Sequence, residues 1–348
     1  MYDLYGKLIG NLSNYLYTYI LIILLVAGGI YFTVRTKFVQ FRYLKESLRV
    51  VLAPSEDDKA ISSFQALMVS TASRVGTGNI AGVSTAICLG GVGSLFWMWL
   101  TALLGMSTAF VEGTLAQIYK RRSDDGGCYG GPSYYIDQAT GKHWLGILFA
   151  VFMILTYMVG FNLVASFNIA DAFRVIPAYS QNENLAKWII GGVLAVLFFV
   201  CISGGGKQIA GITEKIVPFM GFFYIAVALF VIVTHINLLP GVFAEIFRSA
   251  FDVKAIFGGF TGSAVMLGIK RGLFSNEAGV GAAACAAGSA GVSHPVKQGL
   301  VQVLSVFLDT CMICTATAML LLCSGVEPQA DMAGMAYVQA AMNSTLGK

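Results

Sequence analysis

Residues 74–83 read Arg-Val-Gly-Thr-Gly-Asn-Ile-Ala-Gly-Val, and residues 271–280 read Arg-Gly-Leu-Phe-Ser-Asn-Glu-Ala-Gly-Val. The two stretches share the pattern Arg-x4-Asn-x-Ala-Gly-Val at a constant offset of 197 residues. Each falls in a long apolar run that glycine and positive charge interrupt. Backbone groups freed inside a bilayer need internal partners, because each unpaired group costs several kcal/mol. Two matched interruptions therefore predict a polar site within a membrane.

The composition around these stretches is that of a polytopic membrane protein. Of the 348 residues, 57% are hydrophobic and 11% are charged, with a formal net charge of +4. Soluble domains carry roughly 25% charged residues. This excludes a cytosolic enzyme, a disordered chain, a disulfide-stapled secreted domain and a nucleic-acid binder. The apolar runs are continuous over about 20 residues, which excludes a transmembrane barrel. We expect an all-α fold.

Eight apolar runs predict eight membrane crossings. Two are interrupted: the second at residues 73–79, and the seventh at Gly268-Ile-Lys-Arg-Gly272. Residues 132–140 and 241–252 predict short helices in the membrane interface. The eight runs cover residues 15–34, 61–89, 92–119, 144–173, 185–203, 212–235, 256–287 and 298–325.

Lysine and arginine orient these crossings, since cytoplasmic loops are enriched in both. With the N-terminus outside, the inner loops hold 13 of the 22 basic residues and the outer segments hold 6. The other three, Arg74, Lys270 and Arg271, lie in the interrupted runs. We therefore predict a multi-pass plasma-membrane protein with its N-terminus outside.

The two interrupted runs are predicted to cross the membrane in opposite directions, because five crossings separate their starts. Opposed, interrupted helices are the best sequence indication of a transport site at the bilayer midplane. Half-helix N-termini there attract a carboxylate, and freed carbonyls bind a cation. We predict a leading helix and basic loop (residues 1–60), a first five-helix repeat (61–240) and the start of an inverted second repeat (241–348).

Charges inside the membrane are functional candidates by default. We interpret Glu277 as a partner of Arg74 or Arg271 that holds the two interrupted helices in register, in preference to a proton relay. Asp309 is the best single cation ligand. An intramembrane enzyme, a channel and a non-transporting fragment are weaker alternatives. No catalytic constellation is apparent, so we expect no enzyme and no cofactor beyond a coupling ion.

Four motifs resemble the alanine or glycine:cation symporter family. The resemblance runs from about residue 15 to 325. The stretch Lys270-Arg-Gly-Leu-Phe-Ser-Asn-Glu-Ala-Gly279 is the most specific of the four. The other three are residues 71–83, residues 126–135 and residues 294–302.

The resemblance implies a LeuT-like fold of two inverted five-helix repeats behind one leading helix. It implies alternating-access import of a small neutral amino acid, alanine or glycine, with Na⁺. Ala72 and Val75 carbonyls would line the sodium site. The residues that it implies for the substrate are Gly76, Thr77, Gly78 and Asn79 for the carboxylate, and the carbonyls of Gly268, Ile269 and Gly272 for the ammonium group.

The sequence departs from the family pattern in two respects. Many relatives have a glutamine near the positions of Val164, Ala165 and Ser166, and this chain has none. Another neutral substrate, such as glutamine, therefore remains an alternative. Coupling to H⁺ is a separate alternative, since the family carries its substrate with Na⁺ and in some members with H⁺. The family fold also needs 11 crossings, of which about 8 are present here. We therefore expect the second repeat to be incomplete and the chain to be a piece of a longer protein.

Overall fold

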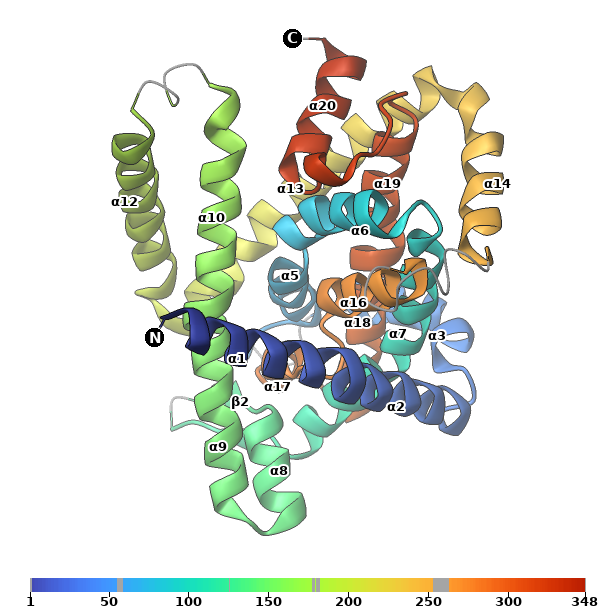
Figure 1. The fold of residues 1–348 in the computed structure, drawn as a ribbon. Helices are drawn as coiled ribbons and strands as arrows, with labels where there is room; N and C mark the ends of the chain where they lie inside the picture. Colours follow the sequence, from blue (N-terminus) through green and yellow to red (C-terminus); the bar gives the residue numbers. More distant parts are fainter. Residues whose placement is uncertain are drawn as a thin grey trace.

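The structure is a computed structural model that describes residues 2–54, 59–124, 126–176, 179, 182–252 and 263–347. These residues are almost entirely helical (Figure 1). Six helical runs are long and apolar enough to cross a membrane, which confirms an all-helical polytopic membrane protein. They are Gly6–Arg35, Ser94–Ile118, His143–Ala172, Glu183–Ile202, Gly205–Thr234 and Pro295–Leu322.

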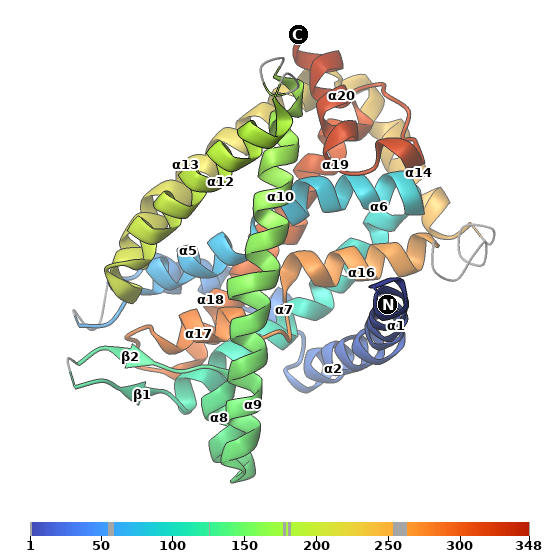
Figure 2. The ribbon, with the colours of Figure 1, turned by 60° about the vertical axis from the view of Figure 1, so that its left-hand side comes forward.

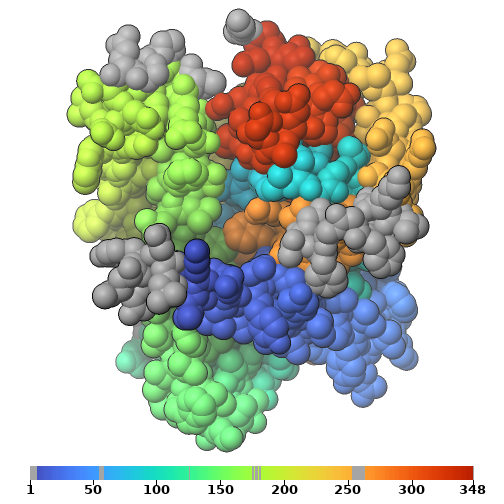
Figure 3. Space-filling model, in the orientation of Figure 1, coloured from blue at the N-terminus to red at the C-terminus, as the bar shows by residue number. Residues whose placement is uncertain are grey.

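The leading segment forms one helical run with a π-helical stretch inside it. It comprises α1 (Tyr2–Tyr15), the π-helix η1 (Leu16–Leu21) and α2 (Ile22–Arg35). In the space-filling view this segment lies across the front of the molecule (Figure 3). It attaches to the body where α2 packs on α7 (Ser94–Ile118). The short helices α3 (Val39–Arg42) and α4 (Leu44–Leu52) follow.

The second apolar run is interrupted where the sequence predicts it. Helix α5 (Ser63–Arg74) begins with a capping box of Ser62 and Gln65 and ends at Arg74. Helical structure resumes as the π-helix η2 (Gly78–Gly82) and continues as α6 (Val83–Gly90). The backbone of Val75 is extended, with ψ of 97°, so the chain leaves the helix immediately after Arg74.

The seventh run is interrupted at a different place from the predicted one. Helix α16 (Ala264–Asn276) continues through Gly268–Gly272, and the break follows at residues 277–281, before α17 (Ala282–Gly288). The prediction of a break at Gly268–Gly272 is therefore wrong. These glycines pack closely on α7: a Cβ at Gly268 would lie 2.4 Å from Ser94 O, and one at Gly272 would lie 3.0 Å from Thr101 Cβ. Residues 256–262 of this run lie outside the described residues.

Helix α7 is the scaffold of the core and packs against both parts of the seventh run (Figure 2). It also packs along α18 (Pro295–Val306), which leads into the π-helix η6 (Phe307–Cys314) and α19 (Thr315–Leu322). The turn η7 (Ala330–Met332) packs on α6, and α20 (Met335–Leu346) packs on α6 and α19.

Two long helical segments stand at one side of this core, and a third crosses behind it (Figure 1), where it packs on α5 and α19. They are α9 (His143–Ile154) with η3 (Leu155–Phe161) and α10 (Asn162–Ala172), then α12 (Glu183–Ile202), then α13 (Gly205–Thr234). The apolar windows of the first two contain no buried residue. Such all-round apolar exposure is what lipid-facing or helix-facing membrane segments present.

The remaining elements are short connections. The hairpin of β1 (Arg121–Arg122) and β2 (Cys128–Tyr129) precedes α8 (Pro132–Thr140), the short helix predicted at residues 132–140. The second predicted short helix is α14 (Leu239–Ala250), which follows the turn η5 (Ile236–Leu238). The turn η4 (Phe173–Val175) ends the α10 run.

Candidate functional site

The two helix interruptions lie against each other in the core, although they are about 200 residues apart in sequence. Arg74 Nε, at the end of α5, donates to the carbonyl oxygen of Asn276, at the end of α16, at 2.7 Å. The Asn79 side chain reaches Ser275 Oγ at 3.3 Å. All four residues are buried. The repeated motif thus brings its two copies together around one polar centre.

The shared asparagines of the motif satisfy backbone groups in their own breaks. Asn79 Oδ1 accepts a hydrogen bond from the Gly76 N–H at 3.1 Å, and Asn276 Oδ1 accepts one from the Ala278 N–H at 3.0 Å. A buried N–H without a partner is costly. An amide side chain at this position therefore allows each helix to open inside an apolar environment.

Asp309 is the centre of a fully buried polar cluster. It lies in the π-helix η6, and its Oδ2 accepts hydrogen bonds from Ser275 Oγ and Thr310 Oγ1, both at 2.7 Å. Its Oδ1 accepts a hydrogen bond from Asn79 Nδ2 at 2.5 Å. Carboxylate and hydroxyl oxygens from η6 and α16 thus converge at one point, and the Asn79 amide of η2 donates to them. Such a set of hard oxygen ligands suits an alkali or alkaline-earth cation.

Arg74 is held by neutral partners. Its Nη1 donates to Gln302 Oε1 at 3.1 Å, and Gln302 in turn donates to Ser70 Oγ at 2.9 Å. Its Nη2 has no hydrogen-bond partner among the described residues. The Arg74 guanidinium therefore links α5, α16 and α18 through neutral hydrogen-bond acceptors. The sequence had predicted a carboxylate as its partner.

Glu277 makes different contacts from the predicted ones. In the described part of the chain it forms no direct ion pair with Arg74 or Arg271, although the Arg74 charge acts on it without contact. Its Oε2 instead accepts hydrogen bonds from Ser73 Oγ at 3.0 Å and from Tyr157 OH at 3.1 Å. Arg271 lies partly buried within α16, away from this contact.

A cavity of about 420 Å³ opens beside the two interruptions. Ala72, Arg74 and Glu277 line it, and so do three of the residues predicted to bind substrate, Gly76, Thr77 and Gly78. Asn79 is completely buried behind it. Gly268, Ile269 and Gly272 do not line this cavity, and Gly268 and Gly272 pack against α7 instead.

An aromatic ladder forms one wall of the cavity. The ring of Tyr157 stacks on Phe161 with centroids 4.8 Å apart, and Phe161 stacks on Phe274 at 5.6 Å. Sequence reasoning identified no aromatic pocket. The spacing of Tyr157 and Phe161, four residues apart, is a helical-face signal, but nothing in it indicates that Phe274 completes the ladder.

Three π-helical segments meet at this site. The segment η2 carries Asn79, η3 carries Tyr157 and Phe161, and η6 carries Asp309. Single π-helical turns occur frequently at functional sites, because the wider turn re-aims side chains and frees backbone groups. Their convergence here marks the cavity and the Asp309 cluster as the candidate site.

The first break frees the carbonyl of Ala72, a residue that lines the cavity. In a continuous helix the Gly76 N–H would bond to Ala72 O, but it is turned to Asn79 Oδ1. The Val75 N–H still bonds to Thr71 O at 2.7 Å. The Ala72 carbonyl, one of the two predicted sodium ligands, therefore loses its helical partner.

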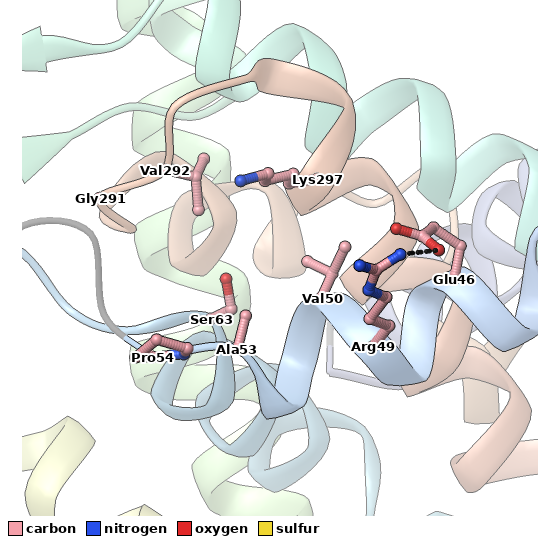
Figure 4. A pocket seen from close by; sticks show the side chains of 9 residues that line it. All are labelled: Glu46, Arg49, Val50, Ala53, Pro54, Ser63, Gly291, Val292 and Lys297. Atoms are coloured by element: carbon pink, nitrogen blue, oxygen red, sulfur yellow. Dashed lines mark ion pairs between the residues drawn. The ribbon is translucent and has the colours of Figure 1, made fainter.

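A second cavity, of about 300 Å³, lies between the end of α4, the start of α5 and the loop before α18 (Figure 4). Arg49 and Lys297 project toward it, and Arg49 pairs with Glu46 at 3.8 Å. None of the predicted site residues lines it.

The comparison with known protein families decides the identity of the chain. The sequence profile of the sodium:alanine symporter family matches residues 2–348. The chain belongs to this family. It is therefore related throughout the described structure to proteins that carry amino acids across membranes.

Individual members of the family support the assignment. The chain is 44% identical to the amino-acid carrier protein AlsT of Bacillus subtilis over 347 residues, which are 100% of this chain and 72% of AlsT. It is 45% identical to the probable sodium/glutamine symporter GlnT of the same organism, with the same coverage. It is 38% identical to the sodium/alanine symporter AgcS of Methanococcus maripaludis, over 92% of this chain and 71% of AgcS. The similarity to these relatives covers at least 92% of this chain, whereas the family motifs in the sequence are four short stretches.

Proposed function

We propose that this protein takes up a small neutral amino acid, alanine or glycine, together with Na⁺ by alternating access. The observation that supports this most strongly is the cavity shared by two helix interruptions, in a chain of the sodium:alanine symporter family. Its walls combine open backbone at Gly76–Gly78 with a carboxylate and aromatic rings. This arrangement suits a ligand that is small, zwitterionic and partly apolar.

The substrate carboxylate would bind at the start of the helix Gly78–Gly90. The first N–H groups of a helix have no intrahelical partners, and the macrodipole places partial positive charge there. Thr77 and Gly78 are at this end and line the cavity. Asn79 would support them from behind, since it holds the Gly76 N–H and so keeps the break open.

The coupling ion has two candidate positions. One uses the Ala72 and Val75 carbonyls at the end of α5. The other uses Asp309 together with the Ser275 and Thr310 hydroxyl groups, which are within 2.7 Å of its carboxylate. A cation at either position would offset negative charge in a core where Glu112, Glu277 and Asp309 are buried with Arg74. Binding of Na⁺ would thereby stabilise the assembled breaks.

The topology of this proposal is that of two inverted repeats. In it, α5–η2–α6 and α16–α17 are the corresponding interrupted helices, and the leading helix precedes the repeats. The basic segment that contains Arg35, Lys37 and Arg42 faces the cytoplasm, because cytoplasmic loops are enriched in lysine and arginine. The N-terminus then lies on the extracellular side of the plasma membrane.

The test is uptake of radiolabelled L-alanine into proteoliposomes that contain the full-length protein. An inward Na⁺ gradient should drive accumulation, and equal Na⁺ on both sides should abolish it. Competition with unlabelled glycine and L-glutamine identifies the preferred substrate, and an imposed H⁺ gradient without Na⁺ tests coupling to protons. Accumulation that needs no Na⁺ gradient, or the absence of any amino-acid uptake, contradicts the proposal.

A further inference from the structure

Glu277 adopts a backbone conformation that side chains other than glycine rarely adopt. Its φ is 49° and its ψ is 21°, in the left-handed region, immediately after the last residue of α16. Glycine is the usual residue at this position, and another residue costs roughly 1–2 kcal/mol. In the described chain, the other non-glycine residues with positive φ are Lys37 and Phe38, in a connecting turn. The Glu277 side chain must therefore make contacts that compensate for this cost.

The two carboxylate oxygens of Glu277 are in different situations. Oε2 accepts the two hydrogen bonds from Ser73 and Tyr157, whereas Oε1 has no hydrogen-bond partner among the described residues. The residue is 3% exposed and lines the cavity of about 420 Å³. One oxygen thus holds the side chain in place, and the other remains free for a ligand.

Among the described residues, Glu277 has neutral hydrogen-bond donors and no cation in direct contact. A buried carboxylate is normally paired with a cation, since its desolvation is costly. Arg74 also lines the cavity, but its Nε and Nη1 are committed to Asn276 O and Gln302 Oε1. The other buried carboxylates nearby are Asp309 in η6 and Glu112 in α7, and the latter accepts the Gly279 N–H at 2.9 Å. Arg74 is thus the nearby positive charge, but it makes no hydrogen bond or ion pair to Glu277 among the described residues.

We propose that the free carboxylate oxygen of Glu277 binds the ammonium group of the amino-acid substrate. This inference rests on the proposed function and assigns one of its subsites. The substrate carboxylate faces the helix start at Thr77 and Gly78, and the ammonium group faces Glu277, so both substrate charges meet opposite partners in one cavity. The predicted ammonium ligands Gly268, Ile269 and Gly272 lie away from this cavity in α16.

Ligands with and without an ammonium group test this assignment. L-Lactate differs from L-alanine mainly in carrying a hydroxyl group in place of the ammonium group. Equilibrium binding of radiolabelled L-alanine to the purified full-length protein, with competition by each compound, gives the preference for the ammonium group. We expect the wild type to prefer alanine by about 100-fold or more, because a site built for a charged donor rejects analogues that lack it.

The variant Glu277→Gln keeps the shape of the side chain and removes its charge. We expect alanine affinity to fall about 10- to 100-fold and lactate affinity to change less than about threefold. Glu183→Gln, at an exposed ion pair with Lys187, is the matched control and should bind as the wild type does. Tyr157→Phe removes one support of the carboxylate and should weaken alanine binding by a smaller factor.

The outcomes separate the assignment from the function that it rests on. Wild-type protein that binds no amino acid contradicts the proposed function. Alanine binding with an unchanged preference over lactate in Glu277→Gln overturns the ammonium assignment alone. If Glu277→Gln elutes as an aggregate, Glu277→Asp is the second variant, since it retains the charge but withdraws it by one methylene. It should lose alanine affinity selectively, and equal losses for alanine and lactate overturn the assignment.

Discussion

Arg74 Nε donates a hydrogen bond of 2.7 Å to the backbone carbonyl of Asn276, so that the last residue of α5 holds the last residue of α16. The same guanidinium reaches Gln302 in α18 at 3.1 Å. Arg74 therefore ties both helix interruptions to one another and to the segment that leads to Asp309. Its charge is balanced by the surrounding buried carboxylates without a direct ion pair.

The first prediction concerns this link. Arg74→Gln should destabilise the folded protein by about 3 kcal/mol, because hydrogen bonds to a charged group contribute roughly 1.5–3 kcal/mol each. Thermal unfolding in detergent, followed by tryptophan fluorescence, measures the effect. Arg49→Gln is the matched control, since that side chain is mostly exposed and its pair with Glu46 should contribute less than about 1 kcal/mol. Equal melting temperatures for the two variants would show that the link is dispensable.

The second prediction concerns Asn79, which supports the open backbone of the first break. Asn79→Ala leaves the Gly76 N–H and the Asp309 carboxylate each without one hydrogen bond. We expect a loss in substrate binding of roughly 1–3 kcal/mol, or about 5- to 150-fold in affinity. The shift of the melting temperature with increasing L-alanine is the measurement. An unchanged shift would mean that Asn79 only fills space.

The third prediction distinguishes the two candidate ion positions. Asp309→Asn removes the buried charge while keeping the size of the side chain. If Na⁺ binds at Asp309, the Na⁺ concentration that gives half-maximal thermal stabilisation should rise at least about tenfold, equivalent to about 1.4 kcal/mol. Asp171→Asn, at a peripheral ion pair with Arg174, is the control. An unaltered Na⁺ requirement would favour the carbonyls of Ala72 and Val75 instead.

The fourth prediction tests whether Gly268 is a packing residue. A Cβ there would lie 2.4 Å from Ser94 O and 2.6 Å from Trp97 Cβ. Gly268→Ala should push α16 away from α7 and cost about 1–3 kcal/mol of stability, as overpacking generally does. Gly192→Ala in α12 has no atom within 4 Å of its Cβ and should be neutral or slightly stabilising. Thermal unfolding of both variants gives the comparison, and a stable Gly268→Ala would contradict close packing.

Much of the fold follows from local sequence. Apolar runs and their lengths predict the helices, because a span needs about 20 apolar residues and its backbone must bond internally. Residues 73–79 predict the first interruption correctly, since they combine glycine, a charged residue and Asn79. The Asn79 side chain accepts a hydrogen bond from the Gly76 N–H of the same segment. The helix at Pro132–Thr140 is likewise predicted, with proline at its start and glycine after its end.

The second interruption shows where local sequence is ambiguous. Glycine can open a helix or can allow a neighbouring helix to approach, and the residue type is the same in both cases. Gly268 and Gly272 allow α7 to pack closely on α16, and the helix stays continuous there. The helix ends instead at Glu277, which takes the left-handed conformation. The hydrogen bonds of Ser73 and Tyr157 that favour this conformation come from distant segments.

By itself, the sequence determined the membrane class, most helices, the first interruption and the paired motifs that indicate a transport site. Only the tertiary structure decided that Asn79 meets Asp309 across 230 residues, and that Tyr157, Phe161 and Phe274 form one wall. The physical reason is the range of the forces involved. Helix formation depends on residues a few positions apart, whereas a buried polar side chain takes whichever partner the packing of distant helices brings within hydrogen-bond distance.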